Sequence, residues 1–176
     1  MKRKSLFIIL GLGLICLAGC ATFQSVVKST FPYTTYLVIP GNITDTAAQS
    51  TTSLATSFDQ DIQKDGDAGV RIKEARVVSA TLKSKNPSDF NLGNLAYVRI
   101  FVAKGDGTGE VMVAYRTDIT AEVGSKLVLD VNNAVLLDEL IKGPNIKIKM
   151  VYKLRNPVAA TTTLHLSLSI NANPGN

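Results

Sequence analysis

The chain has few of the residues that most often carry out chemistry. Its 176 residues include two cysteines, one histidine and no tryptophan. Cys16 and Cys20 both lie in the first 20 residues, so the rest of the chain cannot form an internal disulfide. His165 alternates with leucines near the C-terminus and has no sequence-adjacent partner. We therefore expect His165 on the polar, solvent-facing side of a strand rather than in the role of a general base.

Catalytic motifs are also absent. No Gly-x-Ser-x-Gly nucleophile elbow occurs, although a Ser-His-Asp triad assembled only by the fold stays open. Paired carboxylates of the kind that hydrolyse glycosides are a further alternative. The chain has only 14 acidic residues, and most of them fall in predicted turns or on outer faces. We therefore predict that the protein is not an enzyme.

Two segments look at first like ion-binding or phosphate-binding loops. Asp59, Asp61, Asp65 and Asp67 cluster within nine residues, but neither register supplies the ligand set of an EF-hand. The glycine-rich segment 105–109 lacks the Gly-Lys-Ser/Thr ending of a phosphate loop, and a hairpin turn is the better interpretation. We predict no metal site and no cofactor.

What the sequence does contain is a complete export signal at its N-terminus. Lys2, Arg3 and Lys4 precede an apolar run over residues 6–17, followed by small residues. This is the three-part layout of a secretory signal. The run is shorter than the roughly 20 apolar residues that a membrane-spanning helix needs, and glycines interrupt it. We expect a cleaved signal over residues 1–19 rather than a transmembrane anchor.

The end of this signal, Leu17-Ala18-Gly19-Cys20, resembles the lipobox of bacterial lipoproteins. The resemblance implies cleavage between Gly19 and Cys20, a diacylglycerol thioether on the Cys20 thiol, and acylation of the new amino group. Several acyl chains hold a protein stably on a membrane, because each buried methylene contributes about 0.8 kcal/mol. Ala21 is not acidic, which in this family implies transport to the outer membrane. The expected location is thus the cell envelope, with the membrane contacted through the lipid.

This processing would also change the charge and the chemistry of the chain. The full sequence has a formal charge of +5, but without Lys2, Arg3 and Lys4 it keeps 16 basic and 14 acidic side chains. A nearly neutral mature chain does not favour nucleic acid as a partner. Cys16 leaves with the signal and Cys20 receives the lipid, so a Cys–His catalytic pair is excluded.

The mature chain is expected to be a tether over residues 20–30 and one domain over residues 31–176. About 157 mature residues are enough to bury a core without disulfides. Period-two alternation and turn residues predict seven strands with no long helix between them, which favours an antiparallel, immunoglobulin-like β-sandwich. The predicted strands are 31–40, 70–85, 95–103, 111–116, 126–131, 145–154 and 161–171.

Several local features refine this prediction. Prolines bracket the first strand, which suits an edge strand. The alternation slips near residues 74–78, which indicates a bulge or a crossing between sheets. Leu54, Phe58 and Ile62 are spaced four apart and predict a short helix that starts near Thr52 or Ser53 and ends at residues 65–67. A second short helical segment is expected over residues 134–141, capped by Asn132 or Asn133 and ended by Gly143-Pro144.

One stretch of the mature chain resembles a known β-sandwich family. The segment 81–92 contains Asn86-Pro87, and a strand, a hairpin, the Val-Gly-Ser-Lys spacer 123–126 and the helical segment 136–141 follow it. This order is similar to the late-embryogenesis-abundant, or water-stress and hypersensitive-response, domain, and the resemblance covers residues 70–173. The layout also resembles uncharacterised sandwich lipoproteins of Bacteroidetes-type bacteria. Neither resemblance implies site residues.

These observations lead to a hypothesis by elimination. We expect a lipid-anchored envelope protein that acts as a non-enzymatic binding or structural module, with other proteins or glycans as partners. One alternative is an envelope hydrolase, which would need two acidic side chains about 5 to 10 Å apart in one pocket. Another is a carrier of an apolar ligand, which would need a dry cavity between the sheets.

Overall fold

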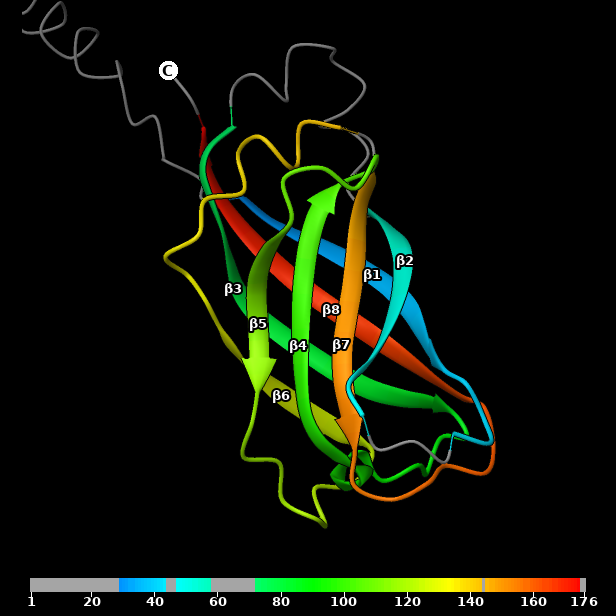
Figure 1. Ribbon diagram of the computed structural model, residues 1–176. Helices are drawn as coiled ribbons and strands as arrows, with labels where there is room; N and C mark the ends of the chain where they lie inside the picture. Colours follow the sequence, from blue (N-terminus) through cyan, green and yellow to red (C-terminus); the bar gives the residue numbers. More distant parts are fainter. Residues whose placement is uncertain (1–28, 44–46, 58–71, 144, 175–176) are drawn as a thin grey trace, which may run out of the picture.

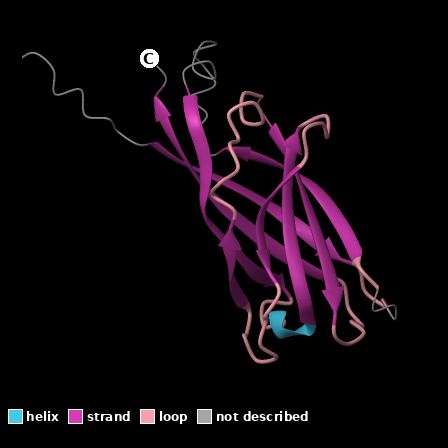
Figure 2. Cartoon of the chain, turned by 60° about the vertical axis from the view of Figure 1, so that its left-hand side comes forward, coloured by secondary structure: helices cyan, strands magenta, loops and turns pink. Residues whose placement is uncertain are grey.

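Eight antiparallel strands make up most of the chain that the structure describes. The computed structural model describes residues 29–43, 47–57, 72–143 and 145–174. One 3-10 helix, Leu92–Asn94, is the only helical element of these residues and precedes the fourth strand (Figure 2). The strands are β1 Ser29–Ile39, β2 Gln49–Ser57, β3 Ile72–Asn86, β4 Leu95–Lys104, β5 Val111–Arg116, β6 Lys126–Val131, β7 Asn145–Leu154 and β8 Thr162–Pro174.

The strands close into a ring in the order β1-β2-β7-β4-β5-β6-β3-β8. In Figure 1, β4, β5 and β7 lie in front, and β1, β3 and β8 cross behind them. The ring is least continuous at two joints, each with two paired residues: Ala114 and Tyr115 join β5 to β6, and Tyr33 and Thr34 join β1 to β2. The prediction of a mainly antiparallel β-fold is confirmed, but there are eight strands, and every strand has two neighbours instead of belonging to one of two separate sheets.

Apolar side chains from all eight strands fill the interior. On β8, Leu164, Leu166, Leu168 and Ile170 are buried, and the residues between them face outward. β7 has the same alternation from Ile146 to Leu154. Full burial of one such side chain contributes about 1.5–3 kcal/mol, so this alternation accounts for the register in which the strands pair.

β3 pairs with β6 and with β8, and a bulge interrupts its ladder to β8. The β3–β8 register shifts between Lys73 and Arg76 and again between Val77 and Ser79. Glu74 has a φ of 56°, which is uncommon for a residue with a side chain. The predicted irregularity at residues 74–78 is confirmed.

Most predicted strands are found within a few residues of their expected bounds. Residues 111–116, 126–131 and 145–154 are strands with the predicted limits. The first strand begins at Ser29, inside the expected tether, and it is not an edge strand because it pairs with both β2 and β8. The last strand continues to Pro174, beyond its predicted end at residue 171.

The helix expected to begin near Thr52 or Ser53 is wrong for the described residues, because Gln49–Ser57 is strand β2. The inward positions of β2 carry small or polar side chains such as Thr51, Ser53 and Ala55. A strand without large alternating apolar residues has a weak period-two signal, which explains why the four-residue spacing was misleading. The rest of that segment, 58–71, lies outside the described residues.

The helix expected over residues 134–141 is also wrong. This segment forms turns, and its backbone bonds partly to β3: the Leu137 N–H donates to the Ala75 carbonyl at 2.8 Å. Leu137 is buried, whereas its neighbour Leu136 is half exposed. Bonds to the β3 bulge replace the bonds that a helix would make to itself. No described helix is long and apolar enough to cross a membrane.

Candidate functional site

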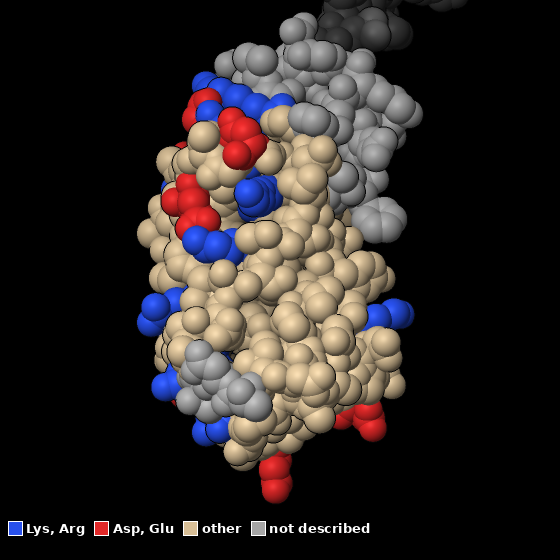
Figure 3. All heavy atoms as spheres, turned by 45° about the vertical axis from the view of Figure 1, so that its right-hand side comes forward, with Lys and Arg blue, Asp and Glu red and all other residues tan. Residues whose placement is uncertain are grey.

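Three neighbouring strands form a wall of the ring without charged residues. β2, β1 and β8 are adjacent in the ring, and their sequences contain no Lys, Arg, Asp or Glu. Serine and threonine supply half of the described outward positions. Figure 3 views the side on which β1 and β2 lie and shows a broad uncharged area, with most charged side chains toward the left and a few at the right edge and the bottom.

The opposite wall of the ring, which includes β7 and β4, carries charged side chains. On β7 and β4, Lys149 lies over the Phe101 ring at 4.9 Å and pairs with Glu110, and Arg99 lies over the Tyr97 ring at 5.1 Å. Exposed ion pairs of this kind contribute little to stability, but they keep a surface solvated. The absence of any such pair from β2, β1 and β8 distinguishes that wall as a candidate interaction surface.

The uncharged wall contains a hollow of about 650 Å³ where β2, β1 and β8 lie side by side. Tyr36 and His165 are cross-strand partners in the β1–β8 register, and their ring centroids are 5.2 Å apart with a tilt of 48°. Tyr36 and Leu54 are 53% and 56% exposed, so a ligand can reach both side chains. The hollow is lined by Thr34, Thr35, Tyr36, Ser53, Leu54 and His165.

Thr35 holds the two strands together at the floor of the hollow. The β1–β2 pairing ends at Thr34 and Thr56. Just beyond this pair, the buried Thr35 hydroxyl lies 2.8 Å from the Ser53 hydroxyl and 2.8 Å from the Leu54 carbonyl oxygen. A side chain thus continues the link between the strands beyond the point where the backbone pairing stops.

The chemistry of these groups suits binding. Hydroxyl groups and an imidazole each donate and accept hydrogen bonds, and the Tyr36 ring offers an apolar face. Among the described residues, no carboxylate lines this hollow, so none of them orients His165 for proton transfer. The expectation that His165 lies on the outer face of the last strand is confirmed, but it is half buried and stacked beside Tyr36.

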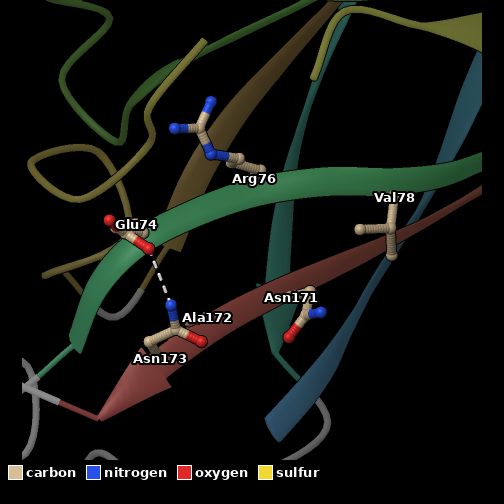
Figure 4. A pocket seen from close by; sticks show the side chains of 6 residues that line it. All are labelled: Glu74, Arg76, Val78, Asn171, Ala172 and Asn173. Carbon is tan, nitrogen blue, oxygen red and sulfur yellow. Dashed lines mark hydrogen bonds between the residues drawn. The ribbon is translucent and has the colours of Figure 1, made fainter. Parts of the chain in front are cut away.

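A second, smaller pocket of about 180 Å³ lies at the β3 bulge (Figure 4). Asn173 Nδ2 donates to Glu74 Oε2 at 2.7 Å, and Arg76 donates to the Asn133 carbonyl at 2.7 Å. Asn171 Oδ1 is buried without a partner. Among the described residues, Glu74 is the only carboxylate that lines the pocket, so these residues do not supply the two acidic groups that a glycoside hydrolase requires.

The other sequence candidates have mixed outcomes. Gly19 and Cys20 lie outside the described residues, as do Asp59, Asp61, Asp65 and Asp67. Among the residues that are described, no three His, Cys, Asp or Glu side chains group as metal ligands.

The glycine-rich segment after β4 is a hairpin turn, as predicted. The Gly107 N–H donates to the Lys104 carbonyl, and the Asp106 carboxylate accepts from the Thr108 N–H and hydroxyl at 2.8 Å each. These bonds from Thr108 lower the pKa of Asp106. The loop therefore satisfies its own polar groups.

Sequence reasoning did not assign Tyr36 to a site, and it used Leu54 only as part of a predicted helix. A usable signal was present, because residues 29–43 and 156–174 contain no Lys, Arg, Asp or Glu. Two such segments that pair with each other predict one uncharged surface, but only the register shows that Tyr36 and His165 meet.

Comparison with known proteins does not assign the chain to a family. No protein family model matches the chain, and no curated protein matches it.

Proposed function

We propose that the protein is a lipid-anchored envelope protein whose β-fold is a non-enzymatic binding module. The Cys20 thiol carries the lipid, and the uncharged wall of β2, β1 and β8 contacts the partner. The hollow beside Tyr36 and His165 is the observation that carries this proposal, because it combines exposed apolar groups with hydrogen-bonding groups and has no charge of its own. The similarity to sandwich lipoproteins remains part of this proposal.

The architecture supports a rigid presentation of the wall. Each residue from Ser29 to Ile39 is paired to β8, so Tyr36 and Val38 are held on a continuous ladder. Their outward neighbours on β8 are His165 and Thr163. Binding residues placed on strands keep their positions better than residues on loops, which lowers the entropy cost of binding.

The anchoring part is tested by metabolic labelling with a radioactive fatty acid. Cys20→Ala should abolish the label and release or misprocess the protein, and Cys16→Ala should leave the label intact because Cys16 is in the signal. Unchanged labelling of Cys20→Ala would contradict the anchor.

The binding part is tested by site-specific photo-crosslinking in living cells. A photo-reactive phenylalanine analogue replaces Leu54 in the hollow or, as a control, Val128 on β6; these residues are 56% and 60% exposed. We expect a discrete adduct from position 54 that is absent from position 128. Identical patterns at the two positions would contradict a specific binding wall.

A further inference from the structure

We infer that the hollow between β2, β1 and β8 binds a neutral saccharide, with one sugar ring stacked on Tyr36. This inference rests on the proposed binding function of the uncharged wall and names the class of ligand. It depends on the lining groups, on the exposure of the Tyr36 ring, and on the charges that surround the hollow.

The lining groups match the surface of a sugar. A pyranose has apolar C–H faces and a rim of hydroxyl groups that donate and accept hydrogen bonds. In the hollow, Tyr36 presents an aromatic ring beside the tilted imidazole of His165, and the lining also includes the hydroxyl groups of Thr34, Thr35 and Ser53. These groups both donate and accept, so they can pair with sugar hydroxyls in either orientation.

The size of the hollow suits a short saccharide. Its volume of about 650 Å³ lies within the range of small-ligand pockets, about 300–1,000 Å³. The exposed large apolar side chains on this wall are few: Tyr36, Val38 and Leu54. A stable protein interface usually has a larger apolar centre, so the hollow favours a small polar ligand over a flat protein surface.

The positions of the charged residues around the hollow indicate that its ligand does not have to be an anion. Among the described residues, no Lys, Arg, Asp or Glu lines the hollow. The nearest charged positions in the pairing are Lys83, opposite His165 on β3, and Lys147, opposite Leu54 on β7. Both lysines lie one strand outside the wall, so a ligand centred on Tyr36 does not need an ion pair. Its binding should depend little on salt.

The test uses the full lipidated chain in detergent micelles and the aromatic NMR signals of His165. Because His165 is the only histidine, its ring resonances report on this site alone. The probes are maltohexaose, cellohexaose and chitohexaose as neutral saccharides, and polygalacturonate as an anionic one. We expect one of the neutral probes to shift the His165 signals in a saturable manner, at both about 0.05 and about 0.5 M NaCl.

Matched variants locate the site. Tyr36→Ala should weaken binding by about 2-fold to about 13-fold, because an aromatic stack is worth about 0.5–1.5 kcal/mol. Tyr115→Ala, at an exposed tyrosine on β5, and Lys83→Gln, at the rim, should leave the affinity unchanged.

Three results would overturn the inference: no shift with any neutral probe, equal binding by Tyr36→Ala, or binding only of the anionic probe with loss at high salt. If position 54 still crosslinks to a protein while no saccharide binds, the proposed binding function survives and the saccharide inference fails.

Discussion

The Asp138 carboxylate accepts the backbone N–H of Ala75 at 2.7 Å, across 63 residues of the chain. Its second oxygen accepts the N–H of Glu74 at 3.2 Å. One side chain in the loop after β6 therefore satisfies two successive amide groups that the β3 bulge removes from the sheet ladder. This contact fastens the loop that contains Leu137 to the wall of the ring.

We expect Asp138→Ala to lower the free energy of unfolding by about 1–3 kcal/mol, because it leaves the buried Ala75 N–H without an acceptor. Asp138→Asn should cost less, since it keeps one carbonyl oxygen. Urea unfolding measures the change. Glu139→Ala is the neighbouring control, since Glu139 makes only an exposed ion pair with Lys142 and its loss should cost little.

Gly93 is a position where any side chain would collide with the backbone of a neighbouring segment. A Cβ at residue 93 would lie 1.9 Å from the Ala121 carbonyl oxygen, so the backbone would have to move. We expect Gly93→Ala to destabilise the protein by about 3 kcal/mol or more. At Gly124, whose φ is +80°, a Cβ meets nothing within 4 Å, and Gly124→Ala should cost about 1–2 kcal/mol from backbone strain alone. Equal losses in thermal unfolding would contradict this difference.

Two adjacent residues of β8 test the inward and outward faces of the ring. Leu168 is fully buried between partners on β1 and β3, whereas Ser169 faces outward. Leu168→Ala should lower the free energy of unfolding by about 2–5 kcal/mol. Ser169→Ala should change it by no more than about 0.5 kcal/mol. Similar values from chemical denaturation of the two variants would argue against the assigned register.

The buried tyrosines predict a loss of stability in alkaline solution. Burial raises the pKa of Tyr33 and of Tyr152. In the unfolded chain a tyrosine loses its proton near pH 10, so between that pH and the raised folded pKa the unfolded state binds fewer protons. The stability from these two residues is therefore complete below about pH 10 and declines as the pH rises further.

The measurement is urea unfolding at a series of pH values from about 8 to about 11. The double variant Tyr33→Phe, Tyr152→Phe should show a smaller decline than the wild type. Tyr36→Phe, at an exposed tyrosine, should follow the wild-type curve. A double variant with the wild-type pH dependence would show that other groups control the alkaline transition.

The sequence predicted the strands best where large apolar residues alternate with polar ones. Residues 145–154 have this pattern throughout, and the structure gives the same bounds to β7. β2 was missed because its hydroxyl-rich sequence has almost no apolar alternation. The segment 134–141 was assigned to a helix because its leucines and valine suit one, but the β3 bulge offers its backbone other partners.

The candidate site was only partly predictable. The polar face of the last strand, with His165 on it, follows from alternation within one segment. The position of Tyr36 beside His165 depends on the register between two strands that are more than 120 residues apart in the chain. Local spacing contains no information about that register.

The sequence by itself determined, for every strand except β2, which segments extend and which of their faces is buried, and that the mature chain has no disulfide if Cys20 is lipidated as proposed. These properties follow from side-chain period and residue type, which are local. Only the tertiary structure decided that the eight strands close into a ring, that Asp138 meets the β3 bulge, and that Tyr36, Leu54 and His165 share one uncharged hollow. Each depends on which strands pair and in what register, and long-range packing sets that choice.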